Sequence, residues 1–427
     1  MTFSLSIFPE LSSVTVLELS STATSSTLNM NVDISALINL EIFKSPGNIG
    51  ISSLTNDLSN NINLKTINIG NCNIGGIIPD YSNVTTLSTI LFNDNSYIGS
   101  IPSLSSNTNL KTLNIGRNSL TGPIPDLSNN IALVSIIGND NSLSGSIPDL
   151  SNNTALQTFN FSTNNISGSI PSLSDNTLIE YIYLNDNNLS GSIPALNSNT
   201  NLYQFKCFNN SLSGDIPNLS NNPNLEDFQV NGNNLTGSIP SLSDNTALRI
   251  FKYGGNNSIT GNIPILSNNT ELINFEGFFT NISGNIPSLN SNTKLKGFFH
   301  SSSNLTGNIP SLNNNTALVN FVVGENDLTG DIPDLSNNTA LVRFEVKNND
   351  LTGFAGGTVS STLLDFKANN NNLSATAVNA ILAAFSAAGG IDGSILLQGG
   401  TNASPTGQGS SAKTTLVNDR GWTVTTN

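Results

Sequence analysis

The sequence predicts a solenoid in which one supersecondary unit is stacked on copies of itself. Three observations support this: Gly-x-Ile-Pro occurs twelve times, apolar residues recur in a fixed frame, and both ends depart from that frame. The prolines of the tetrapeptide are Pro79, Pro102, Pro125, Pro148, Pro171, Pro194, Pro217, Pro240, Pro264, Pro287, Pro310 and Pro333. Ten of the eleven gaps are 23 residues and one is 24, a regularity typical of repeat architectures. Function is then expected on the extended surface that the stacking creates.

Each repeat follows the frame L-x-x-L-x-L-x-x-N-x-L-x-G. In the unit that starts at Leu341, the residues that match this frame are Phe344, Val346, Asn349, Leu351 and Gly353. The fourth and sixth places are apolar and are expected to point inward from a short strand. The asparagine amide can donate and accept, so it can pair backbone groups of neighbouring coils that would otherwise be buried unpaired. The expected ladder residues are Asn95, Asn118, Asn141, Asn164, Asn187, Asn210, Asn233, Asn257, Asn326, Asn349 and Asn371.

The remaining part of each unit is expected to return the chain to the start of the next coil. Gly of the tetrapeptide allows the backbone torsions of a bend, and Pro with its preceding Ile favours extended backbone. The arm Pro333–Thr339 is short and rich in asparagine, which predicts polyproline-like or 3₁₀ turns instead of a helix.

This pattern resembles the leucine-rich repeat family, in particular the subclass with plant-type G-x-I-P units, over residues 40–375, or about 14 units of 23 residues. The resemblance implies a curved, right-handed superhelical array with a parallel sheet on the concave face and an irregular, 3₁₀-containing convex side. The chain departs from plant receptors in having no paired cysteines in its caps, no membrane span and no kinase. It is more similar to the cysteine-poor repeat proteins encoded by bacteria and phages.

The two ends are expected to cap the array. Residues 1–39 form an N-terminal cap or docking segment, with an alternating strand signal over Val14–Leu19. Residues 376–427 form a small α/β cap, because Ser374 begins a helical pattern that Gly389 and Gly390 end. A strand at Ile395–Leu397, a helix near Ser411–Asp419 and a strand at Trp422–Val424 follow. This C-terminal segment resembles the caps of leucine-rich proteins encoded by bacteria and their phages.

Composition excludes several classes of function. The formal net charge is -14, and fourteen basic residues spread over 427 positions cannot form a dense phosphate-binding stripe. This argues against nucleic acid and against an anionic membrane surface as partners. The first residues lack the pattern of a secretory signal, and no apolar run approaches the length of a membrane span.

The usual catalytic and metal-binding residue types are scarce. His300, the single histidine, falls at an inward place without a nucleophile or acid in frame, so it is interpreted as an irregularity of packing. Cys72 replaces a ladder asparagine and Cys207 takes a core place, and both are expected to be free thiols. Recurrent aspartates such as Asp126 and Asp149 are interpreted as a solvated edge in preference to a calcium ridge. No enzyme activity, metal or cofactor is therefore predicted.

Aromatic and basic residues on outward places are the candidate binding residues. They are Tyr181, Tyr183, Tyr203, Lys206, Phe208, Arg249, Lys252, Phe278, Phe279 and Phe299. Because equivalent places in adjacent coils lie about 4.8 Å apart, the rings are expected to form two patches on the concave face. Aromatic rings with amide neighbours suit a sugar or a protein surface. The alternative is that frame slips place some of these residues in the core, for example at Gly277 and Phe278.

Three functions remain open from the sequence. The first is a non-enzymatic recognition protein of a phage virion, such as a tail or head fibre, which binds a glycan or protein of the bacterial envelope. Its caps would then contact other virion proteins. The second is a bacterial surface or secreted adhesin, and the third is a structural spacer or decoration protein. The virion is the expected location, with the extracellular space or the bacterial surface as the alternative.

Overall fold

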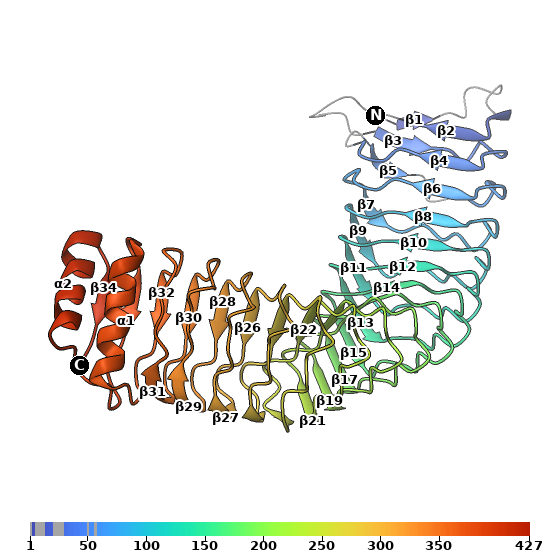
Figure 1. The fold of residues 1–427 in the computed structure, drawn as a ribbon. Coiled ribbons are helices and arrows are strands. Elements are labelled where there is room, and N and C mark those ends of the chain that lie inside the picture. The colour runs from blue at the N-terminus through green and yellow to red at the C-terminus, as the bar shows by residue number, and fades with distance from the viewer. Residues whose placement is uncertain (1, 5–12, 20–29, 49–50, 55–57) are drawn as a thin grey trace. The chain divides into compact units, whose positions relative to one another are not determined.

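The computed structural model describes residues 2–4, 13–19, 30–48, 51–54 and 58–427. The chain divides into two compact units, Met1–Leu212 and Ser213–Asn427. Each unit is a stack of coils with parallel sheets, and the chain makes about 14 turns before a small helical C-terminal cap (Figure 1). The predicted solenoid is confirmed. Of the predicted N-terminal cap, residues 1, 5–12 and 20–29 lie outside the described part.

The main sheet of the first unit contains one short strand from each coil. Its strands are β2 (Val16–Glu18), β4 (Ile42–Lys44), β6 (Thr66–Asn68), β8 (Thr89–Leu91), β10 (Thr112–Asn114), β12 (Ser135–Ile137), β14 (Thr158–Asn160), β16 (Tyr181–Tyr183) and β18 (Gln204–Lys206). Neighbours pair in parallel and in register, as Thr112 with Ser135 and Leu113 with Ile136. The central residue of each strand faces the core, so the first and third residues face outward.

The main sheet of the second unit has the same design. Its strands are β20 (Asp227–Gln229), β22 (Ile250–Lys252), β24 (Asn274–Glu276), β26 (Gly297–Phe299), β28 (Asn320–Val322), β30 (Arg343–Glu345), β32 (Asp365–Lys367), β33 (Ser394–Leu396) and β34 (Thr423–Thr425). The last two strands belong to the C-terminal segment, so the cap extends the sheet of the array.

A second set of parallel strands follows each bend. In the first unit these are β7 (Gly75–Ile77), β9 (Ser96–Gly99), β11 (Ser119–Gly122), β13 (Ser142–Ser146), β15 (Asn165–Gly168) and β17 (Asn188–Ser192). β1 (Thr2–Ser4), β3 (Met30–Asp33) and β5 (Ile51–Leu54) form a three-stranded N-terminal sheet. β19 (Ser211–Asp215) crosses the sequence boundary of the units. The second unit contains β21 (Asn234–Ser238), β23 (Ser258–Thr260), β25 (Ser283–Asn285), β27 (Asn304–Asn308), β29 (Asp327–Ile332) and β31 (Asp350–Phe354).

Glycine and short turns close each coil. All twelve glycines of the tetrapeptide have φ between 69° and 93°, a region that a side chain disfavours. In the return arm the Asn153 amide donates to the Leu150 carbonyl (2.9 Å) and the Leu156 amide to the Asn153 carbonyl (3.0 Å). Two successive turns with a three-residue span therefore replace a helix, in agreement with the predicted 3₁₀-type turns.

A column of stacked phenylalanines fills the inward fourth place throughout the second unit. It consists of Phe228, Phe251, Phe275, Phe298, Phe321, Phe344 and Phe366. Successive ring centroids lie 5.4–6.1 Å apart with interplanar angles of 12–22°. The first unit fills this place mainly with aliphatic residues such as Ile67, Ile90 and Ile136. Offset stacking contributes about 0.5–1.5 kcal/mol per pair beyond burial, so the column stabilises the order of the coils.

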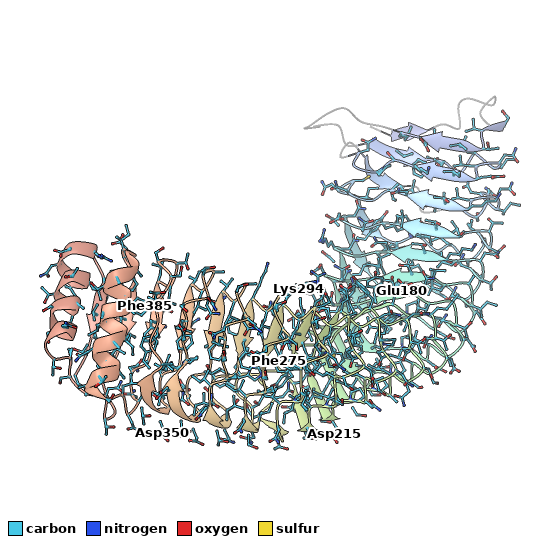
Figure 2. All side chains as sticks on the ribbon, in the orientation of Figure 1. Glu180, Asp215, Phe275, Lys294, Asp350 and Phe385 are labelled. Carbon is cyan, nitrogen blue, oxygen red and sulfur yellow. The ribbon has the colours of Figure 1, made fainter. Side chains whose placement is uncertain are left out.

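The C-terminal helices cover the end of this column. α1 (Ala375–Ala388) has Ser374 as its N-cap and Gly389 in the left-handed conformation as its C-cap, as predicted. Phe385 of α1 contacts Phe366 edge-on, with centroids 5.2 Å apart, and Trp422 contacts Phe385 at 5.4 Å (Figure 2 labels Phe275 and Phe385). α2 (Gln408–Arg420) packs against α1. The cap thus shields the last apolar ring from water.

Candidate functional site

The outward residues of the main-sheet strands form the surface that is called the strand face below. In the first unit, the first residues of β6, β8, β10, β12 and β14 give the row Thr66, Thr89, Thr112, Ser135 and Thr158. The side chains of this row are small, uncharged and carry a hydroxyl group. The next strand in this row begins with Tyr181, so the character of the face changes at β16.

The tyrosine patch consists of Tyr181, Tyr183, Tyr203, Gln204 and Lys206. The Tyr181 ring lies 6.2 Å from that of Tyr183 and 5.6 Å from that of Tyr203, the latter pair edge to face. The Tyr183 hydroxyl donates to Oε1 of Gln204 (2.8 Å), and Nζ of Lys206 lies 5.5 Å from the centroid of the Tyr183 ring. All five side chains are half-buried. Mutual packing fixes the rings and leaves part of each accessible, which is the geometry of a preformed recognition surface.

The structure refines where these residues lie relative to the strands. Tyr181, Tyr183 and Lys206 are outward strand residues, whereas Tyr203 directly precedes β18. Phe208 lies beyond the end of β18 and is half-buried. The expectation that all the aromatics occupy outward strand places is therefore wrong for Tyr203 and Phe208, although Tyr203 still contacts Tyr181.

The candidates of the second unit do not form a comparable aromatic patch. Phe278 and Phe279 follow β24 instead of lying on it, and Phe279 has φ of 53° and an exposed fraction of 57%. Their rings contact each other edge-on at 5.7 Å. Phe299 is an outward residue of β26, and its ring lies against the backbone of Gly297. The predicted second patch on the strands is thus reduced to Phe299, with Phe278 and Phe279 on the neighbouring turn.

The two basic candidates of the second unit are paired with carboxylates. Nζ of Lys252 lies 3.0 Å from Glu276, and Arg249 lies 3.4 Å from Glu226. Arg249 precedes β22, whereas Lys252 is an outward strand residue. In the strand register Lys252 aligns with Glu276, and Glu276 with Phe299, so these three side chains form one row.

A more extensive charged cluster surrounds Glu345 on β30. Its carboxylate is 5% exposed and contacts Arg343 (2.5 Å), Lys347 (3.2 Å) and Lys367 (3.4 Å). Burial alone would raise the pKa of Glu345, but hydrogen bonds from Arg343 and Lys347 outweigh it and lower the pKa below the ordinary value. Asp365 and Glu325 pair with the same cations, so the cluster has little net charge.

The ladder asparagines connect consecutive coils. Asn187 donates through Nδ2 to the carbonyls of Phe161 (2.9 Å) and Leu184 (3.2 Å), and its Oδ1 accepts from the Ile166 amide (3.0 Å). The residues that repeat this type of bonding are Asn95, Asn118, Asn141, Asn164, Asn210, Asn233, Asn326, Asn349 and Asn371.

Asn257 is wrongly assigned to this ladder by the sequence frame. The residue that occupies the place is Asn256, whose Nδ2 donates to the carbonyls of Val230 (3.0 Å) and Tyr253 (2.7 Å), while Asn257 is exposed. The gap between Pro240 and Pro264 is 24 residues long, one more than the usual 23. The extra residue of this coil follows the ladder residue Asn256 and does not precede it. Cys72 does occupy a ladder place, because its Sγ contacts the Ser45 carbonyl at 2.8 Å.

A second asparagine row on the return arm was missed by the sequence frame. Asn176 is fully buried, and its Nδ2 donates to the carbonyls of Leu150 and Asn153, both at 3.0 Å. Its other members are Asn61, Asn107, Asn130, Asn153, Asn199, Asn222, Asn245, Asn269, Asn292, Asn315 and Asn338. The sequence contains a pattern that predicts this row, because an asparagine stands five residues after the proline in most units, as Asn153 after Pro148 and Asn176 after Pro171.

His300 lies inside the coil stack, as the sequence predicted. It is fully buried, its Nε2 lies 2.8 Å from the Tyr253 hydroxyl, and burial lowers its pKa to about 3. Cys207 is likewise buried and free, and burial raises the pKa of its thiol. Within the described residues, no three His, Cys, Asp or Glu side chains are grouped so as to hold a metal ion. The helices described here are all too short or too polar to cross a bilayer.

Comparison with known proteins identifies the fold. No protein-family profile matches the chain, and neither does any curated protein sequence. Among solved structures, the chain is similar to the plant peptide hormone receptor RGFR1 in complex with RGF2, with 28% identity and a TM-score of 0.73. That match covers 90% of this chain and 68% of the receptor chain.

Two further structures extend the comparison. A TDR receptor matches 99% of this chain and 91% of its own, with 20% identity and a TM-score of 0.65. The functional domain of InlJ from Listeria monocytogenes matches 82% of this chain and 74% of its own, with 20% identity and a TM-score of 0.57. The chain therefore has the leucine-rich-repeat solenoid fold, a scaffold that typically serves recognition and binding.

Proposed function

We propose that this chain is a non-enzymatic recognition protein whose strand face binds a ligand through the tyrosine patch. The observation that carries the proposal is the packing of Tyr181 against Tyr183 and Tyr203, next to a row of small hydroxyl residues on β6 to β14. Clustered, oriented aromatic side chains are enriched at binding hot spots, because they bury large areas at low entropic cost. The similarity to the plant peptide hormone receptor RGFR1, whose structure is a complex with RGF2, supports a binding role for this scaffold.

The biological setting we propose is a phage virion, in which the chain is part of a tail or head fibre. The ligand is then a glycan or protein of the bacterial envelope, and the caps contact other virion proteins. The support is the resemblance of the C-terminal segment to caps of phage-encoded repeat proteins, whose helix–strand–helix–strand order is present as α1, β33, α2 and β34.

Cell-binding measurements with matched variants test the role of the patch. Fluorescently labelled protein is added to a panel of bacterial strains and bound protein is measured by flow cytometry. The triple variant Tyr181→Ser, Tyr183→Ser, Tyr203→Ser is expected to reduce binding by about tenfold or more, since each lost anchor typically costs over 1 kcal/mol. The control, Thr66→Ala, Thr89→Ala, Thr112→Ala, alters three outward places of the same face and is expected to bind as the wild type does.

The outcomes separate the possible functions. If the wild type binds no strain, the proposed role in binding bacterial cells is wrong. If the triple variant folds and binds fully, the ligand site lies elsewhere. Immunogold labelling of intact particles tests the virion assignment, because an adhesin would instead label the bacterial surface.

A further inference from the structure

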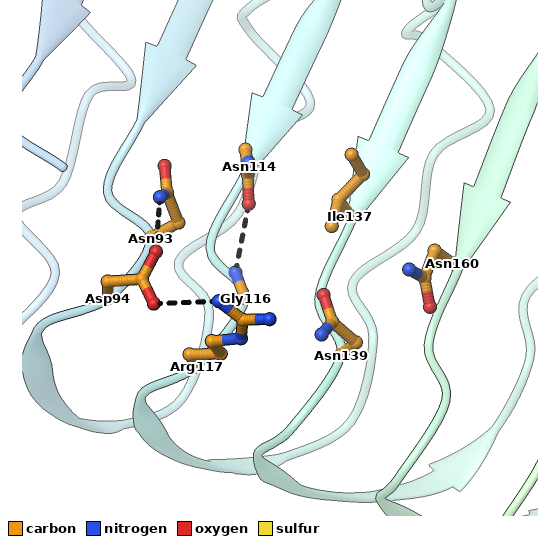
Figure 3. A pocket seen from close by; sticks show the side chains of 8 residues that line it. All are labelled: Asn93, Asp94, Asn114, Gly116, Arg117, Ile137, Asn139 and Asn160. Atoms are coloured by element: carbon orange, nitrogen blue, oxygen red, sulfur yellow. Dashed lines mark hydrogen bonds and ion pairs between the residues drawn. The ribbon is translucent and has the colours of Figure 1, made fainter. Parts of the chain in front are cut away.

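A pocket of about 300 Å³ lies on the strand face of the first unit (Figure 3). It is formed where β8, β10, β12 and β14 end and the chain turns. Its walls are polar, with asparagine amides on several sides, and Ile137 is the apolar wall residue. This volume is at the lower limit of typical small-ligand sites.

The repeat itself creates this pocket, because each coil contributes the same place to its wall. Asn114, Ile137 and Asn160 are the third residues of three consecutive strands and are aligned in register. Gly116 opens the space in front of them, since a Cβ atom there would lie 2.5 Å from Oδ1 of Asn139. A side chain at Gly116 would therefore displace Asn139 and fill part of the pocket.

The charged groups of the pocket are already paired with one another. Arg117 lies 3.3 Å from Asp94 and 3.8 Å from Asp140. Asn93 donates to the Asp94 carboxylate (2.7 Å), and this hydrogen bond lowers the pKa of Asp94, so the carboxylate is ionised at neutral pH. An anionic ligand would meet the carboxylate of Asp94, and a cation would meet the guanidinium of Arg117. This arrangement favours an uncharged ligand.

The amides provide unused hydrogen-bonding capacity of both kinds. Oδ1 of Asn114 accepts from the Gly116 amide (3.2 Å), and Oδ1 of Asn160 accepts from Ser162 (2.9 Å), which leaves their NH₂ groups as donors. Asn139 uses its NH₂ group on Asp140 (2.6 Å), which leaves its carbonyl oxygen as an acceptor. Hydroxyl groups donate and accept at once, so neighbouring sugar hydroxyls match this mixture, while Ile137 can contact the C–H face of a sugar ring.

The tyrosine patch lies on the strand next to the one that ends the pocket. Asn160 on β14 pairs in register with Tyr183 on β16, so the two side chains lie about 4.8 Å apart along the sheet. A chain of sugar units could therefore pass from the amides to the tyrosine rings without leaving the strand face. Alternating hydrogen-bonding and aromatic subsites suit a linear, hydroxyl-rich ligand better than a peptide side chain.

We propose that the pocket around Asn114, Asn139 and Asn160 is a saccharide subsite, and that it forms one groove with the tyrosine patch for a neutral oligosaccharide. This inference rests on the proposed recognition function and specifies its ligand class. The amides bind sugar hydroxyls, Ile137 and the tyrosine rings contact the apolar faces of successive sugar units, and the Asp94–Arg117 pair holds the pocket walls in place.

A printed array of neutral and anionic oligosaccharides tests the inference. Wild-type protein is expected to bind at least one neutral oligosaccharide. Asn114→Ala and Asn160→Ala are each expected to weaken that binding about tenfold, the loss expected for hydrogen bonds made in a partly desolvated site. Asn68→Ala is the matched control, because Asn68 is also the third residue of its strand and accepts from the Gly70 amide, but lies outside the pocket.

A second pair of variants distinguishes loss of the binding site from loss of folding. Ile137→Ala is expected to weaken binding about fivefold by removing an apolar contact, whereas Leu91→Ala, in the same row of the sheet but outside the pocket lining, is expected to leave it unchanged. Circular dichroism verifies that each variant is folded.

The outcomes distinguish this inference from the proposed function. If the wild type binds cells but no neutral oligosaccharide, or if the pocket variants bind the array as well as their controls do, the saccharide subsite is wrong and the recognition role stands. If neutral oligosaccharides bind and the pocket variants lose them, but no strain is bound, the subsite stands and the cellular role is wrong.

Discussion

The Tyr253 hydroxyl lies 2.8 Å from Nε2 of His300, although the two residues belong to coils that are separated by a whole turn. The intervening coil has Gly277 at its inward sixth place, and the Tyr253 ring occupies the space that a side chain would fill there. A Cβ atom at Gly277 would lie 2.1 Å from Cζ of this ring. Gly277 is thus a packing requirement of Tyr253 and does not mark a slip of the repeat frame.

Replacing Gly277 by alanine is expected to destabilise the second unit by about 1–3 kcal/mol, the usual cost of inserting atoms into a packed core. The measurement is urea unfolding followed by circular dichroism. Because the clash is with the Tyr253 ring, combining Gly277→Ala with Tyr253→Val should destabilise the unit by less than the sum of the two single changes. Valine occupies the same inward place at Val230 and Val346.

The control for this prediction is Gly75→Ala. Its Cβ atom would meet only the Ser96 carbonyl, at 3.7 Å, so a change below about 0.5 kcal/mol is expected. Equal effects at Gly75 and Gly277, or additive effects of the two changes at Gly277 and Tyr253, would contradict the packing interpretation.

His300 is expected to make stability depend on pH between about 3 and 6.5. Burial lowers its folded-state pKa to about 3, whereas the unfolded value is about 6.5, so in this range the unfolded state binds more protons. The contribution is fully present above pH 6.5 and is lost as the pH falls. From pH 7 to pH 5 the loss is about 2 kcal/mol.

A double variant isolates this effect from that of the carboxylates. Tyr253→Phe with His300→Leu removes the titrating group together with its hydrogen-bond partner and keeps the site apolar. The difference in unfolding free energy between pH 7 and pH 5 should then shrink by about 2 kcal/mol. If the variant and the wild type lose the same stability on acidification, His300 does not have the low pKa inferred from its burial.

Structural features that recur in every repeat could be predicted from the sequence. Features that depend on packing between different coils could not. The ladder at Asn187, the caps of α1 and the bend glycines follow from local chemistry at fixed spacing. The shift from Asn257 to Asn256 depends on where an extra residue is accommodated, which the period alone does not specify. The Tyr253–His300 contact was missed because it requires the absence of a side chain at Gly277, one coil away from either partner.

The residues of the candidate site were also predicted only in part. Outward places on the strands follow from alternation, so Tyr181, Tyr183 and Lys206 were placed correctly. Phe278 and Phe279 were not, because the strands are only three residues long and the chain has turned before it reaches them. The pocket beside Asn114 was not predicted, since it depends on Gly116 and on an ion pair between coils.

The two asparagine rows are expected to contribute unequally to stability. Asn187→Ala removes three donated contacts and one accepted bond. It leaves the buried Ile166 amide without its acceptor, so about 3 kcal/mol is expected. Asn176→Ala removes only donated bonds, because its Oδ1 has no partner, and about 2 kcal/mol is expected. Exposed Asn188→Ala is the control, with a change below about 0.5 kcal/mol. A larger loss at Asn176 than at Asn187 would show that the return-arm row dominates.

Replacing Glu345 by glutamine is expected to lower the free energy of unfolding more than the same replacement at an exposed, ion-paired glutamate. Glu345→Gln removes a carboxylate that is 5% exposed and is contacted by Arg343, Lys347 and Lys367. These cations are 25–40% exposed and keep Asp365 and Glu325 as partners, so a loss of about 1–3 kcal/mol is expected. Lys294 and Glu271 lie 2.6 Å apart, but their side chains are 57% and 44% exposed, so Glu271→Gln should cost less than about 1 kcal/mol (Figure 2 labels Lys294). Urea unfolding at low and high salt distinguishes the two sites, because salt screens the exposed pair and hardly affects the buried cluster. Equal losses for the two variants would mean that the carboxylate of Glu345 is hydrated and that the cluster is a surface feature.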